Sequence, residues 1–461
     1  MTARRSYALL WAGQFTATAG LTVVVPLLPF YLAGFGLRGA DLALWTGLAL
    51  TAPAVTQVVS TGFWGWVGDR HGRAAMVLRA QIGLAIAVGL MALADSPWEF
   101  LAARLIQGAF GGVGAASAAF TCSLAQTRNR GRSLGGLVGA TGAGSLVGPL
   151  IGSLLAASFG YPMLFTVVAA LLAGVSVASL LLLREPPASR AARREQPKTG
   201  FGGATRRLWA NPSSRNLILA GFAAQAAIYA VLVVFALRVQ QVTSSTGEAT
   251  VWVGVLQAAT WAAALVGSAW WGWRNDRKLA HRNFALAAAG CALAVAAQGF
   301  PMDPALLLPS RVVQGFCFVA LAQSVLYVVA GLLPEHVRGA GMGAATGLIE
   351  SGQVVGPLLG SLTAALLPLP VAFAAIATLL GVAAVLAAVG GRPQTQQPPT
   401  PATPLVAALV KPPASTPTAE PVATPALAAP RATAPAGPLP ELLSRRLAWS
   451  PIARPKAGAR R

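Results

Sequence analysis

Charged side chains are scarce in this chain of 461 residues: they make up 10% of it, whereas hydrophobic residues make up 55%. Soluble globular proteins carry about 25% charged residues. The deficit excludes an ordinary soluble protein and indicates many membrane-spanning segments. Acidic residues are the scarcest charged type, with 13 Asp and Glu against 34 Lys and Arg. A carboxylate inside an apolar segment of this chain is therefore a functional candidate.

Cysteine and histidine are also scarce, with three of each. Cys122, Cys291 and Cys317 lie in separate apolar runs, so they form neither a zinc-binding nor a disulfide pattern. No Walker A pattern occurs, and the apolar runs hold no Ser-His-Asp set, metal cluster or paired carboxylates. We therefore expect a protein that is not an enzyme, hydrolyses no ATP and binds no cofactor or metal.

Long apolar runs are abundant. Twelve of them occur, at residues 7–33, 42–67, 74–94, 98–124, 133–158, 161–183, 214–237, 249–273, 283–300, 304–330, 340–366 and 369–390. Each is close to the ~20 residues that an α-helix needs to cross the hydrocarbon core. The sequence thus predicts an all-α membrane protein with twelve transmembrane helices in a lipid bilayer.

Basic residues concentrate in alternate connections between these runs. Residues 184–215 hold eight basic and two acidic residues, and residues 391–461 hold nine basic and two acidic. Because Arg and Lys favour the cytoplasmic side of a membrane, we expect both termini in the cytoplasm and a location in the cell inner membrane. The net charge of +21 follows the same bias, so we expect no nucleic-acid partner.

The two halves of the chain repeat each other. The Arg-x-x-Gln-Gly motif at 104–108 recurs at 311–315, and the Gly-Pro-x-x-Gly motif at 148–152 recurs at 356–360. The offsets are 207 and 208 residues. Such a repeat predicts two pseudo-symmetric six-helix bundles related by an axis along the membrane normal, with a site between them.

The predicted organisation has four parts. Residues 1–183 form the first bundle, 184–213 a basic cytoplasmic linker, and 214–390 the second bundle. Residues 391–461 are rich in Pro, Ala and Thr, which predicts a disordered cytoplasmic tail.

A glycine-rich, charged segment separates the second and third runs: Gly62-Phe-Trp-Gly-Trp-Val-Gly-Asp-Arg-His-Gly-Arg73. It closely resembles the signature loop between helices 2 and 3 of the major facilitator superfamily. The Gly-Pro-x-x-Gly motif in the fifth run resembles the motif that is diagnostic of the twelve-span drug:proton antiporter branch. The resemblance implies the major facilitator fold and secondary transport by alternating access.

The same segment is expected to form a charged β-turn that acts as a cytoplasmic gate. We expect Asp69 to follow the end of the second span, to cap the N-terminus of the eleventh near 339–343, and to pair with Arg128 or Arg130. The predicted gate residues are Gly65, Asp69, Arg70, Gly72, Arg73 and Arg130. The alternative is a solvated turn that only fixes topology.

Glu350 and Arg104 are the candidates for proton coupling. Glu350 lies near the middle of the eleventh span, and on a continuous helix it would share one face with Thr346, Gln353 and Pro357. Arg104 lies in the fourth span and matches the family's proton-coupling motif. The alternatives are a buried helix-to-helix hydrogen bond for Glu350 and snorkelling for Arg104. The first span contains no Asp or Glu, although many relatives of this branch place an acid there.

Uncharged polar and aromatic residues in the spans predict a central cavity for a bulky, partly polar solute. The predicted cavity residues are Gln14, Gln107, Gln225, Tyr229, Gln257, Trp261, Arg311, Gln314 and Gln353. Each of them could instead make only a packing hydrogen bond. Close helix packing is predicted at Gly144, Gly148, Pro149, Gly152, Gly356, Pro357 and Gly360.

The sequence therefore predicts a monomeric secondary transporter that exports small organic molecules, of the multidrug efflux type, in exchange for protons. A dedicated exporter of a polar metabolite such as a siderophore is the first alternative, because Arg104 and Arg311 would suit an anionic or polyhydroxyl cargo. A non-transporting sensor on the same fold is the second.

Overall fold

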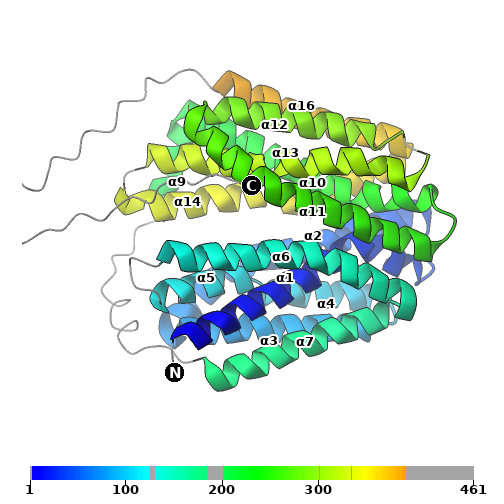
Figure 1. Cartoon of the computed structure of the whole chain (residues 1–461), viewed down its shortest axis with the longest axis horizontal. Coiled ribbons are helices and arrows are strands. Elements are labelled where there is room, and N and C mark those ends of the chain that lie inside the picture. Colours follow the sequence, from blue (N-terminus) through cyan, green and yellow to red (C-terminus); the bar gives the residue numbers. More distant parts are fainter. Residues whose placement is uncertain (1–2, 125–129, 184–200, 301, 334, 391–461) are drawn as a thin grey trace, which may run out of the picture. The chain divides into compact units, whose positions relative to one another are not determined.

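The computed structural model describes residues 3–124, 130–183, 201–300, 302–333 and 335–390, and these are helical apart from short turns (Figure 1). The first half contains α1 (Ala3–Ala33), α2 (Gly39–His71), α3 (Arg73–Ala92), α4 (Pro97–Ala109), α5 (Val113–Leu124), α6 (Arg130–Phe159) and α7 (Tyr161–Leu182). The second contains α10 (Pro212–Gln241), α11 (Thr246–Arg277), α12 (Ala280–Ala297), η2 (Pro304–Leu307), α13 (Leu308–Leu332), α14 (Glu335–Glu350), α15 (Gly352–Leu366) and α16 (Leu369–Gly390). A short helix, α9 (Phe201–Ala210), lies within the predicted linker. The predicted disordered tail lies outside the described residues.

All twelve predicted spans are helical, but two of them are interrupted. Ten helices in the described ranges are long and apolar enough to cross a membrane. The other two predicted spans are each divided, the fourth into α4 and α5 and the eleventh into α14 and α15. The expectation of one continuous helix in the fourth and eleventh spans is therefore wrong.

The break in the fourth span is stabilised by side chains of neighbouring helices. Gly112 has φ +95°, a left-handed conformation that glycine adopts without a steric penalty. Trp64 Nε1 donates to the Ala109 carbonyl at 2.6 Å, and Arg79 Nη2 donates to the Gly111 carbonyl at 3.2 Å. These donors satisfy carbonyl groups that a break inside a membrane would otherwise leave unpaired.

The connection between α2 and α3 is shorter than the sequence suggested. Helix α2 continues to His71 and α3 begins at Arg73, so Gly72 alone separates them, with φ +99°. The Gly72 N–H donates to the Gly68 carbonyl at 3.1 Å and ends α2. The predicted β-turn is therefore wrong, and Asp69 lies in the last turn of α2 instead of after it.

Helix packing repeats between the halves, as the motifs do. Helix α6 lies against α1, and α15 lies against α10. At Gly148 a Cβ would meet the Ala19 carbonyl of α1, and at Gly356 it would meet the Ala226 carbonyl of α10. Glycine is needed here because the two backbones are in direct contact.

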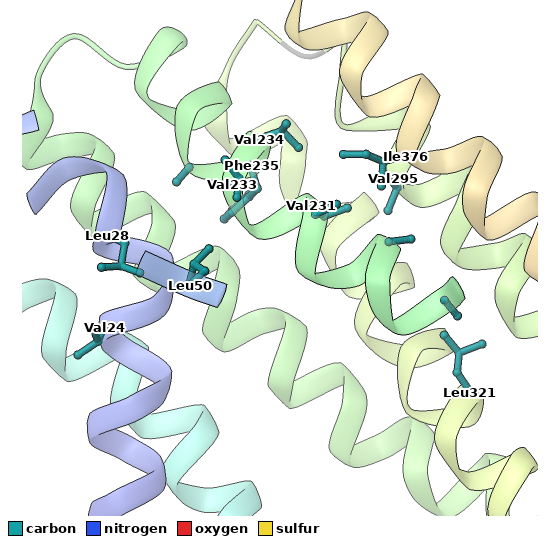
Figure 2. Packing of buried hydrophobic residues seen from close by; sticks show 14 of the residues in the cluster. Val24, Leu28, Leu50, Val231, Val233, Val234, Phe235, Val295, Leu321 and Ile376 are labelled. Carbon is teal, nitrogen blue, oxygen red and sulfur yellow. The ribbon is translucent and has the colours of Figure 1, made fainter. Parts of the chain in front are cut away.

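Buried apolar side chains of both halves belong to one cluster. Figure 2 shows Leu28 of α1 and Leu50 of α2 together with Phe235 of α10 and Ile376 of α16. In a membrane protein such packing depends on close van der Waals contact, because lipid is as apolar as the side chains.

Candidate functional site

Arg104 is a buried cation without an acidic partner among the described residues. It lies on α4, is 2% exposed, and donates from Nε to the Ala49 carbonyl at 2.8 Å and from Nη1 to Gln107 Oε1 at 2.6 Å. Within the described part of the chain, Arg104 Nη2 and Gln107 Nε2 have no acceptor. A buried guanidinium that keeps free donors is available to an anionic group that enters the site.

One tyrosine of the second half interacts with both this cation and an acidic residue. Tyr229 on α10 is half-buried, and its hydroxyl interacts electrostatically with both Arg104 and Glu350. Glu350 is the last residue of α14, next to the break at Ser351, and its side chain is exposed. The structure thus brings a cation of the first half and an acid of the second half to the same tyrosine.

Arg311, the repeat counterpart of Arg104, has different surroundings. It is 1% exposed, donates from Nη1 to Gln314 Oε1 at 2.9 Å, and donates from Nη2 to Gln257 Oε1. Its guanidinium also lies 4.0 Å from the centre of the Phe235 ring. Both terminal nitrogens of Arg311 are thus used inside the second half, whereas Arg104 leaves one of them without an acceptor in the described ranges.

The remaining predicted cavity residues lie on α1, α10, α11 and α15. Gln14 Nε2 donates to the hydroxyls of Thr18 at 3.2 Å and Thr141 at 3.0 Å. The other three residues, Gln225, Gln353 and Trp261, are half-buried. Gln107 and Tyr229 are the two polar cavity residues that accompany Arg104 and Glu350.

The gate residues are described only in part. Arg70 lies over the Trp66 ring at 4.0 Å, and Arg73 Nη1 donates to the Ala119 carbonyl at 2.9 Å. The surroundings of Gly65, the side chains of Asp69, Arg128 and Arg130, and positions 339 and 340 of the predicted cap at 339–343 lie outside the described part of the chain. The latch between Asp69 and the eleventh span therefore stays a prediction.

Asp69→Asn tests that prediction. The substitution keeps the size of the side chain and removes its charge, so a latch that depends on a helix N-terminus and an arginine would weaken by about 0.5–2 kcal/mol. We expect transport to fall by about 2- to 30-fold at unchanged expression, as measured by substrate efflux from cells. A wild-type efflux rate in the variant would show that Asp69 only fixes topology.

The two halves are in close contact on one side of the membrane. Gly47 of α2 packs against Ser361 of α15, and Gly254 of α11 packs against Ser153 of α6. All four residues lie toward the side on which α2 and α11 begin. These four residues are not among the predicted packing positions, although the pairs recur at offsets of 207 and 208 and extending the repeat would have found them.

On the other side of the membrane the corresponding helix faces are open. Gly135 and Gly139 precede Gly142 on the face of α6 that meets Leu265 of α11, yet no heavy atom of the described residues lies within 4 Å of a Cβ placed at either glycine. The same holds at 343 and 347 on α14, the repeat positions of these two glycines. Among the described residues, the halves are therefore in contact on one side, and these faces of α6 and α14 have no close neighbour on the other.

Comparison with known proteins identifies relatives over most of the chain. The profile of the Major Facilitator Superfamily matches residues 10–305 and 253–456. The Staphyloferrin B transporter of Staphylococcus aureus is 34% identical over 359 residues, which cover 78% of this chain and 86% of that protein. The multi-drug resistance efflux pump PmrA homolog of Lactococcus lactis is 28% identical over 362 residues, which cover 78% of this chain and 88% of that protein.

Solved structures share the fold. The nucleoside transporter NupG matches with a TM-score of 0.71 at 15% identity, covering 86% of this chain and 100% of that one. A bacterial homolog of the human lysosomal transporter Spinster, in an inward-facing and occupied conformation, matches with a TM-score of 0.68 at 17% identity, covering 85% and 97%. The sequence profile, the relatives and the fold agree that this multi-pass membrane protein is a transporter and not an enzyme, and that it belongs to the major facilitator superfamily.

Proposed function

We propose that this protein exports small organic molecules by alternating access, in exchange for protons. The observation that supports the proposal is that Tyr229 of the second half interacts electrostatically both with Arg104 of the first half, which is bonded to Gln107, and with Glu350. A solute bound among these side chains contacts both halves, so its binding depends on how the halves are arranged. That dependence is what couples a solute to alternating access.

Glu350 is the proposed proton carrier. A carboxylate inside a membrane is energetically costly, so its presence there indicates a function. The Glu350 side chain is exposed and makes no hydrogen bond with a described residue. Protonation and a cationic group of the cargo would compete for the same carboxylate. One proton entering through about 100 mV supplies about 2.3 kcal/mol, which sustains between one and two decades of cargo gradient.

The proposed orientation follows the distribution of basic residues. The termini and the linker lie in the cytoplasm, so the open side of the structure, where α6 and α14 begin, faces the cytoplasm. We propose that residues 1–183 and 214–390 move as two bundles within a monomer in the bacterial inner membrane. Reporter fusions that placed the linker 184–213 outside the cell would contradict this arrangement.

Two cargo classes have specific support. Multidrug efflux is the first, because the PmrA homolog and the MdtG protein of Rahnella, 26% identical over 369 residues, have names that describe multidrug resistance. Siderophore export is the second, since the Staphyloferrin B transporter is 34% identical and the buried Arg104 would suit an anionic group of the cargo.

Expression in a bacterial strain that lacks its own exporters tests the proposal. We expect the wild-type protein to lower the accumulation of ethidium, norfloxacin or added staphyloferrin B, and to do so only while the proton gradient is maintained. Unchanged accumulation of all three compounds, with the protein present in the membrane, would count against export.

A further inference from the structure

Arg104, Gln107 and Tyr229 present hydrogen-bond donors that no described residue uses. In the described residues, Arg104 Nη2, Gln107 Nε2 and the Tyr229 hydroxyl have no hydrogen-bond partner, although Arg104 and Gln107 are more than nine-tenths buried. These three atoms remain accessible to a bound molecule, because none of them is a fully buried unpaired atom. Three unused donors around one buried positive charge match the chemistry of a carboxylate.

The Glu350 carboxylate, which also interacts with Tyr229, has no hydrogen-bond donor or cation among the described residues. Glu350 makes no ion pair with any described cation, and its side chain is exposed at the end of α14. One turn earlier, no heavy atom of the described residues lies within 4 Å of a Cβ placed at Gly347, so within them the approach to Glu350 is open. An ammonium group is the natural partner of this carboxylate.

These two unused groups have opposite charges and belong to opposite halves. A purely cationic cargo would be repelled by Arg104, and a purely anionic cargo would be repelled by Glu350. A cargo with an acid at one end and an amine at the other would satisfy both. Tyr229, which interacts electrostatically with both residues, would lie beside the bound molecule.

We propose that the central site binds zwitterions, with the cargo's carboxylate held by Arg104, Gln107 and Tyr229 and its ammonium group by Glu350. The proposal rests on the proposed function and names the class of cargo. It also fits proton exchange, because a proton that reaches Glu350 displaces the ammonium end while the acid end stays on the other half. The Arg311 cluster would not take this role, since Gln257 and Gln314 already occupy its terminal nitrogens.

A matched set of three ligands tests the proposal on the purified full-length protein. Norfloxacin has a carboxylate and an amine at opposite ends of a rigid aromatic system. Its ethyl ester keeps only the amine, and its N-acetyl derivative keeps only the acid. Because a hydrogen bond to a charged group contributes about 1.5–3 kcal/mol, we expect norfloxacin to bind about ten-fold or more tightly than either derivative, as measured by fluorescence titration.

Two substitutions should remove the two preferences separately. In Arg104→Gln, norfloxacin and its ester should bind equally, while the N-acetyl derivative stays weaker. In Glu350→Gln, norfloxacin and its N-acetyl derivative should bind equally, while the ester stays weaker. Tyr229→Phe keeps the ring and should lower only the preference over the ester, which provides a milder variant if Arg104→Gln does not fold.

Equal wild-type binding of norfloxacin and its ester would overturn the proposal. So would a uniform loss of affinity for all three ligands in both variants, because that result indicates a structural role. Efflux of ethidium without binding of norfloxacin would overturn the zwitterion site and leave the exporter function standing. A protein that transports none of the compounds would contradict the exporter function itself.

Discussion

Glu350→Gln is expected to abolish transport that is driven by a pH gradient. Glutamine has the size of protonated glutamate and cannot release a proton, so the variant cannot use the gradient. In proteoliposomes with an imposed gradient of about one pH unit, one-for-one exchange lets the wild type build a cargo gradient of up to about ten-fold. We expect no accumulation above equilibrium for Glu350→Gln, measured with norfloxacin as the probe.

The same variant should still exchange cargo across the membrane. Exchange of labelled for unlabelled norfloxacin at saturating concentration requires the halves to move but requires no proton release. Glu99→Gln is the matched control, because Glu99 is an exposed acid at the start of α4 and accepts only a local hydrogen bond from the Asp95 N–H at 2.9 Å. Gradient-driven accumulation that survives in Glu350→Gln would show that another group carries the proton.

Gly254→Val is expected to shift the protein away from the arrangement in this structure. A Cβ at Gly254 would collide with the Ser153 side chain of α6, so the two halves could not close on that side. Overpacking of this kind costs about 1–3 kcal/mol, which changes the ratio of the two states by roughly 5- to 150-fold. We expect the transport rate in cells to fall by a comparable factor at unchanged expression.

Maleimide labelling measures directly which side of the protein is open. Gly139→Cys, placed in a background without the three native cysteines, should react quickly with maleimide because no heavy atom of the described part of the chain lies within 4 Å of a Cβ there. Adding Gly254→Val should slow this labelling, since the other side of the membrane then closes. Gly174→Val is the control, because Gly174 lies on an open surface of α7. Unchanged labelling and transport in Gly254→Val would show that this contact does not open during the cycle.

The helices could be predicted because each span depends only on the residues of its own segment. Twenty consecutive apolar residues satisfy the bilayer whatever their neighbours are, so composition alone located all twelve spans. The internal repeat also indicated which helices are equivalent, and it led to Arg104 and Arg311 as a pair. The two breaks were not predictable in the same way, because a helix interruption in a membrane requires donors from other helices. Trp64 and Arg79, which supply them in the fourth span, lie on α2 and α3.

The candidate site shows the same division. Glu350 and Arg104 stood out in the sequence because a charge inside an apolar run is costly and therefore informative. The sequence motif did not distinguish Arg104 from Arg311, because the same motif surrounds both residues. Only the folded chain distinguishes them, because Gln257 reaches Arg311 from a neighbouring helix while its repeat counterpart near Arg104 is the apolar Leu50.

The sequence by itself determined the environment of this protein, its span count and its two-fold repeat, since these follow from hydrophobicity and spacing along the chain. The tertiary structure alone decided which polar groups remain unpaired among the described residues and on which side the halves meet. Both depend on side chains brought together from distant helices, which no local pattern specifies.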